Sequence, residues 1–128
     1  MRVRIAATFA ARARGLLGRS RAWLGDGGLL VIVPCSSVHT FGMRDDIDVA
    51  FVAADGTVLK SVQGVLPGKM LWAHGAVAVI ERFALPMTRT GKAQQWFSEG
   101  DSVTLRGRGE LGKCQASGKC ATISCARH

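Results

Sequence analysis

The residues best suited to bind a ligand or move a proton lie close together near the middle of the chain. A histidine, a methionine, an arginine and an aspartate occur within ten residues, beside a phenylalanine. An imidazole exchanges protons near neutral pH, and a carboxylate can accept a proton or orient the imidazole. We take this group as the candidate ligand-binding site: His39, Phe41, Met43, Arg44 and Asp48.

The same stretch has the alternating pattern of a β-hairpin. Polar and apolar side chains alternate over residues 35–43 and again over residues 47–51, with a short polar turn between them. In a hairpin with a two-residue turn, Met43 lies opposite Asp48, which can then accept hydrogen bonds from His39, from Arg44 or from turn amides. A buried carboxylate needs such partners. These residues therefore either form a pocket for a polar ligand or form a hydrogen-bonded cluster that stabilises the hairpin.

Catalysis by these residues is an alternative to simple binding. His39 and Asp48 would act as acid and base if the fold brought them together. Cys35 and His39 could form a nucleophile pair, but four residues of extended strand span about 13 Å, whereas such a pair must lie about 3 Å apart. We therefore assign no catalytic residue and favour a binding module over an enzyme.

Positive charge is concentrated at the two ends of the chain. The formal net charge is +8, yet residues 1–21 carry six arginines and no acidic residue, while residues 22–106 are nearly balanced. A nucleic-acid groove needs a positive stripe across the fold, so we do not expect nucleic acid as a partner. An anionic ligand or surface is the alternative that these arginines support: Arg12, Arg14, Arg19 and Arg21.

Residues 107–128 differ in composition from the rest of the chain. They are rich in glycine, lysine, serine and cysteine, which predicts a flexible, disordered basic tail after a single compact domain over residues 1–106. Four soft metal ligands lie in this tail, but their spacing lacks the close pairs typical of zinc sites. We expect free thiols, no metal and no cofactor, and keep as a weak metal candidate Cys114, Cys120, Cys125 and His128.

Many short apolar segments between glycine-containing turns predict a mainly β fold. We expect about six to eight mostly antiparallel strands in a small barrel or sandwich, with one or two short helices. The first helix should cover residues 9–17, with Thr8 as its N-cap. The sequence contains no apolar run long enough to cross a membrane and no clean cleavage site near its arginine-rich start. These features predict a cytoplasmic protein.

Several motifs together resemble domain-of-unknown-function family 192, a group of small prokaryotic proteins. The resemblance covers about residues 5–106 and rests on the segments 14–19, 28–30, 38–44 and 47–51, on Asp55-Gly56, on Glu81 after a Val-Ile pair, and on Gly100-Asp101. It implies a small barrel-like, mostly β domain with one or two short helices. It supplies no activity and no cofactor.

We therefore predict a binding module for a small polar ligand or a protein. The hairpin over residues 35–48 and the loop over residues 66–74 would present the binding surface. An acid–base enzyme and a binder of nucleic acid or of an anionic surface through the N-terminal arginines are the two alternatives.

Overall fold

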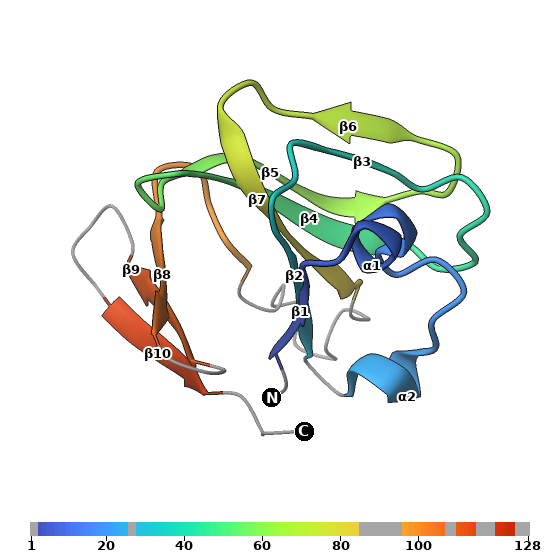
Figure 1. The fold of residues 1–128 in the computed structure, drawn as a ribbon, viewed down its shortest axis with the longest axis horizontal. Coiled ribbons are helices and arrows are strands. Elements are labelled where there is room, and N and C mark those ends of the chain that lie inside the picture. Colours follow the sequence, from blue (N-terminus) through green and yellow to red (C-terminus); the bar gives the residue numbers. More distant parts are fainter. Residues whose placement is uncertain (1–2, 26–27, 85–95, 107–109, 115–119, 125–128) are drawn as a thin grey trace, which may run out of the picture.

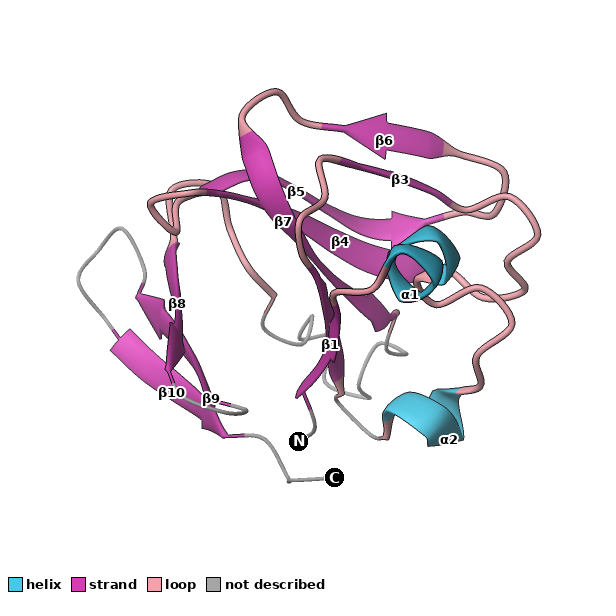
Figure 2. Cartoon of the chain, viewed as in Figure 1, coloured by secondary structure: helices cyan, strands magenta, loops and turns pink. Residues whose placement is uncertain are grey.

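The computed structural model describes residues 3–25, 28–84, 96–106, 110–114 and 120–124. Its frame is a five-stranded sheet in the order β1-β2-β7-β4-β5 (Figures 1 and 2). Strands β1 and β2 are parallel, and the other neighbours are antiparallel. The strands of this sheet are β1 (Val3–Ala6), β2 (Leu29–Ile32), β4 (Ile47–Ala53), β5 (Val58–Val65) and β7 (Ala76–Phe83).

Two short helices, α1 (Phe9–Arg14) and α2 (Arg21–Leu24), fill the crossover that a parallel pair of strands requires. The predicted N-cap of α1 is confirmed, because the Oγ1 of Thr8 accepts a hydrogen bond from the Ala11 amide at 3.2 Å. The helix ends three residues earlier than predicted. Gly15 adopts a φ of +53° and a ψ of −129°, a backbone conformation that favours glycine and cannot continue the helix.

The sheet separates two cores, because successive side chains of a strand point to opposite faces. We call the face covered by α1, α2 and the strands β3 (Ser37–His39) and β6 (Met70–Trp72) the helix face. We call the other the far face, which packs against Trp96 and Phe97. The strand residues in the helix-face core include Ile32, Val49, Phe51 and Val79, and those in the far-face core include Val31, Ala50, Val52 and Ile80.

Strands β3 and β6 form a two-stranded ribbon outside the main sheet. The predicted hairpin between residues 35–43 and 47–51 is therefore wrong: β3 pairs with β6, whereas β4 pairs with β5 and β7. Thr40 explains the difference. Its amide donates to the Lys69 carbonyl at 2.8 Å and its hydroxyl donates to the Leu66 carbonyl at 2.7 Å, which ties the end of β3 to the β5–β6 loop.

The mainly β class is confirmed, but a closed barrel is not. In the described part of the chain, β1 and β5 are the edge strands of the main sheet, which does not close on itself. A separate antiparallel sheet contains β8 (Ser102–Arg106), β9 (Glu110–Cys114) and β10 (Cys120–Ser124).

The prediction of a disordered tail is wrong for β9 and β10. Backbone pairing between strands does not require the large apolar side chains that this region lacks. The division of the chain into a domain that ends at residue 106 and a flexible tail stays a prediction.

Candidate functional site

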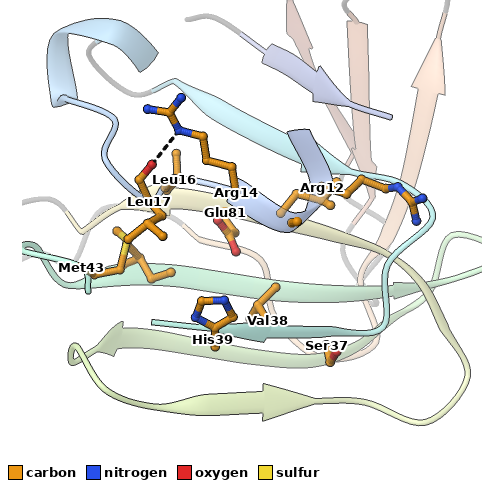
Figure 3. Close-up of a pocket in the computed structure, with 13 residues that line it drawn as sticks. Arg12, Arg14, Leu16, Leu17, Ser37, Val38, His39, Met43 and Glu81 are labelled. Atoms are coloured by element: carbon orange, nitrogen blue, oxygen red, sulfur yellow. Dashed lines mark hydrogen bonds between the residues drawn. The ribbon is translucent and has the colours of Figure 1, made fainter. Parts of the chain in front are cut away.

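A cavity of about 250 Å³ lies on the helix face, between β3 and the loop that follows α1 (Figure 3). Helix α1 and strands β2, β3 and β7 each contribute to its wall. The lining is partly apolar, with a few polar groups, which is typical of small-molecule sites. Among the lining residues are the apolar Leu16, Leu17, Val38 and Met43 and the polar Ser37, His39 and Glu81.

Glu81 is the acidic residue among those that line this cavity. It shares the helix face with Val79, its neighbour two residues away on β7, and is only 3% exposed. Its carboxyl lies against the loop after α1: a Cβ on Gly15 would sit 3.3 Å from one carboxyl oxygen and 3.8 Å from the other. The Leu16 amide donates a hydrogen bond to the carboxyl. A glycine at position 15 therefore leaves the room that the carboxyl occupies.

Burial raises the pKa of Glu81 to about 7, and the hydrogen bond from Leu16 opposes this rise. The ion pairs of the described residues do not include Glu81. Arg12 Nη1 donates instead to the Pro34 carbonyl at 3.0 Å, and Arg14 Nε donates to the Leu17 carbonyl at 2.9 Å. Figure 3 shows both side chains directed away from Glu81. The carboxyl is thus about half ionised at neutral pH and has no cationic partner among the residues that the structure describes.

Cys35 lies beside this site as a free, half-buried thiol. Burial raises its pKa, and the negative charge of Glu81 adds to the rise, whereas the hydrogen bond to Ser37 and the charge of Arg12 oppose it. The Sγ of Cys35 donates to the Ser37 carbonyl at 3.0 Å. These surroundings keep the thiol protonated, which is the opposite of what a nucleophilic cysteine needs.

Two of the five predicted ligand-binding residues reach the cavity. His39 lines it from β3, and Met43 lines it from the segment before β4. Phe41 stacks on the His39 ring, with 5.6 Å between centroids and 25° between planes, and is itself 50% exposed. Phe41 therefore covers the imidazole without lining the cavity.

Arg44 belongs to a neighbouring groove of about 720 Å³, which shares Leu17 and Met43 with the cavity. Arg19 and Arg21 line the same groove. The four arginines of the predicted anion site are therefore divided between two sites: Arg12 and Arg14 line the cavity, whereas Arg19 and Arg21 line the groove.

Asp48 lies on the far face, away from the cavity. Its Oδ2 accepts from Arg82 Nε at 2.7 Å and its Oδ1 accepts from the Gly64 amide at 2.8 Å. The Arg82 guanidinium in turn stacks on the Trp96 ring at 4.4 Å. Because His39 and Asp48 lie on opposite sides of the sheet, the structure does not bring them together as an acid–base pair.

The described residues contain no group of three or more histidine, cysteine, aspartate or glutamate side chains that could hold a metal ion. Of the four tail candidates, Cys125 and His128 lie outside the described residues. Cys114 is in a disulfide bond, so the expectation of a free thiol is wrong at this residue. A disulfide sulfur is not the thiolate that zinc requires. Cys120 lies opposite Cys114 in the β9–β10 pair.

Glu81 is not among the site residues that we predicted from the sequence, although the sequence contains a signal for it. Glu81 is an acidic residue inside an otherwise apolar strand, and glutamate is rarely buried without a partner. The segments 14–19 and 38–44, which with Glu81 carry part of the family resemblance, contribute Gly15, Leu17 and His39 to the same cavity.

The fold and the cavity define a small mainly β protein with an open sheet, a two-stranded ribbon over one face and a ligand-sized hollow beneath a helix–loop segment. The chain belongs to domain-of-unknown-function family 192, described as an uncharacterized ACR, whose model matches residues 1–104. A comparison with curated proteins found no match.

Two solved structures are similar to this fold. A protein of unknown function from Novosphingobium aromaticivorans DSM 12444 is 26% identical, with a TM-score of 0.55, over 63% of this chain and 61% of that one. A protein from Sinorhizobium meliloti 1021 described as a putative transcription regulator is 20% identical, with a TM-score of 0.60, over 78% of each chain. The second likeness concerns the fold alone.

Within the described residues, none of the helices has the length and apolar character needed to cross a membrane. The longer of the two helices, α1, has six residues.

Proposed function

We propose that this protein is a binding module that holds a small polar ligand in the cavity around Glu81. The observation that carries the proposal is a carboxyl group that is 3% exposed, faces a cavity and has no ion-pair partner among the described residues. Burying an unpaired carboxyl costs stability. A ligand group that pairs with the carboxyl would offset that cost.

The size of the cavity suits a small molecule. A volume of about 250 Å³ corresponds to roughly eight water-sized groups at about 30 Å³ each. Leu17, Val38 and Met43 offer apolar contacts, while Ser37 and His39 offer polar ones. This combination can both desolvate a ligand and orient it.

A fragment screen followed by two-dimensional NMR tests the proposal. Compounds that bind should shift the resonances of residues 15–17, 37–39 and 81. Ala13 is exposed on α1 and lines the cavity, so Ala13→Trp should weaken the binding of those compounds at least tenfold.

Ala10 is exposed on the same helix but does not line the cavity, so Ala10→Trp is the matched control and should leave binding unchanged. If no compound shifts these resonances, or if both variants act alike, the proposal is wrong.

A second candidate function is the binding of an anion by the arginines near α2. The Arg4 and Arg19 guanidiniums lie 4.3 Å and 4.2 Å from the Trp23 ring centroid. Burial lowers the pKa of Arg19, and the charges of Arg14 and Arg4 lower it further. An anion placed among these guanidiniums would relieve their mutual repulsion.

Titration with inorganic phosphate at two salt concentrations tests this second candidate. Phosphate should bind less tightly as salt rises, and Arg19→Gln should weaken it further. An affinity for phosphate that does not change with salt concentration, or that is the same in Arg19→Gln as in wild type, would count against an anion site.

A further inference from the structure

We infer that the ligand of the Glu81 cavity is a small molecule with an apolar body that presents a protonated amine to the Glu81 carboxylate. This inference rests on the proposed binding function and adds the chemical class of the ligand. It follows from the hydrogen-bonding capacity of Glu81, from the charges around it and from the apolar wall of the cavity.

Glu81 has acceptor capacity to spare. An ionised carboxylate offers about four lone-pair sites, and the partner that the structure gives it is the Leu16 amide. Gly15 adds no side chain at the place nearest the carboxyl oxygens. A ligand ammonium, with three N–H donors, can therefore bind there without displacing a protein group.

Among the described residues, the charged and titratable groups around the cavity do not supply a cation that pairs with Glu81. From α1, Arg12 and Arg14 line the cavity but donate to the Pro34 and Leu17 carbonyls. From β3, His39 is exposed at the edge of the cavity. Cys35 carries a protonated thiol, and the Asp48–Arg82 pair lies beyond the sheet on the far face. A ligand cation at Glu81 would therefore form a new ion pair and would not have to displace a cationic side chain of the described residues.

A ligand carboxylate fits this place less well. Two carboxyl groups in one small cavity repel each other unless one of them keeps its proton. An ammonium gains a charge-assisted hydrogen bond in the same position. The two ligand classes therefore predict opposite responses to pH: an amine binds best when Glu81 is ionised, and a carboxylate binds best when Glu81 is protonated.

Three probes with the same four-carbon body separate these possibilities: butylammonium, butanol and butyrate. Each is titrated into the full chain at pH 8 and pH 6 and followed by the NMR resonances of residues 15–17 and 37–39. Butylammonium should bind most tightly and lose about tenfold in affinity from pH 8 to pH 6, because the ionised fraction of a carboxyl with a pKa of about 7 falls about tenfold. An alkylamine itself stays protonated up to about pH 10.

Two variants assign the pH effect to one residue. Glu81→Gln keeps the shape of the side chain and removes its charge, so butylammonium should bind at least tenfold more weakly at pH 8 and become insensitive to pH. An unchanged NMR spectrum outside the cavity shows that this variant is folded. His39→Gln should keep the pH effect, because His39 lines the cavity without contacting the Glu81 carboxyl in the interactions of the described residues.

The outcomes distinguish the ligand class from the binding function. Butanol or butyrate in the cavity without butylammonium overturns the amine assignment and leaves the proposed function standing. Butylammonium binding that ignores pH, persists in Glu81→Gln or loses its pH effect in His39→Gln also overturns the assignment. If none of the three probes binds, the amine assignment fails, and the broader fragment screen decides the proposed function separately.

Discussion

Arg82 Nε lies 2.7 Å from Asp48 Oδ2, and both side chains are less than one-tenth exposed. The two residues are direct cross-strand partners on β7 and β4. The second carboxylate oxygen of Asp48 accepts the amide of Gly64 on β5. Asp48 therefore links three adjacent strands of the sheet, which makes it a structural residue and not part of the cavity.

Replacement of Asp48 should destabilise the fold strongly. Asp48→Asn removes the negative charge that faces the buried Arg82 guanidinium, which we expect to cost about 3 kcal/mol of unfolding free energy. Urea unfolding measures this loss. His39→Ala removes an exposed side chain and should cost less than about 0.5 kcal/mol. Equal losses in the two variants would contradict a structural role that is specific to Asp48.

The stability of the protein should fall as the pH rises through the range from 4.5 to 7. Glu81 keeps its proton up to about pH 7 in the folded chain but loses it near its ordinary value of 4.5 when unfolded. In this window the folded state binds more protons than the unfolded state, so the free energy of unfolding decreases with pH, by about 3 kcal/mol in total.

The pH dependence of urea unfolding in wild type and Glu81→Gln tests this expectation. The variant has no carboxyl at this position, so its stability should fall less between pH 4.5 and 8. Parallel curves for the two proteins would show that Glu81 titrates alike in the folded and unfolded states.

Gly15 should tolerate a side chain poorly, for two separable reasons. Its φ of +53° is unfavourable for alanine, and the added Cβ would lie 3.3 Å from a Glu81 oxygen. We expect Gly15→Ala to cost about 1–3 kcal/mol in urea unfolding. Gly68 also has a positive φ, of +83°, but a Cβ there meets nothing within 4 Å. Gly68→Ala should therefore cost less, and an equal cost would mean that the contact with Glu81 adds nothing.

Thr40 should matter for the attachment of the β3–β6 ribbon. It is 1% exposed, and its hydroxyl both donates to the Leu66 carbonyl at 2.7 Å and accepts the Lys69 amide at 2.8 Å. Thr40→Val keeps the shape and leaves these two groups unpaired, at a cost of about 2 kcal/mol.

Unfolding by urea and amide exchange of the ribbon check this prediction for Thr40. The exposed Thr104 provides the control, since Thr104→Val should change neither measurement. Ribbon amides that exchange as slowly in Thr40→Val as in wild type would argue against the role of this hydroxyl.

The local features of this protein follow from short stretches of its sequence. Period-two alternation and glycine turns predict a mainly β fold, Thr8 predicts the start of α1, and the motifs identify the family. Each of these signals acts between residues close together in the chain. They also single out His39 and Met43 as candidate ligand-binding residues, and both side chains line the cavity.

Long-range packing of the folded chain, by contrast, selects which strands pair and which face of the sheet each polar residue occupies. Alternation separates the two sides of one strand, but it does not tell which strand will become its neighbour or which side will be covered. Here β3 pairs with β6, so the expected hairpin does not form, and Asp48 turns to the far face. Glu81 instead meets the loop after α1, about 65 residues earlier in the chain, and this long-range packing creates both its burial and its raised pKa.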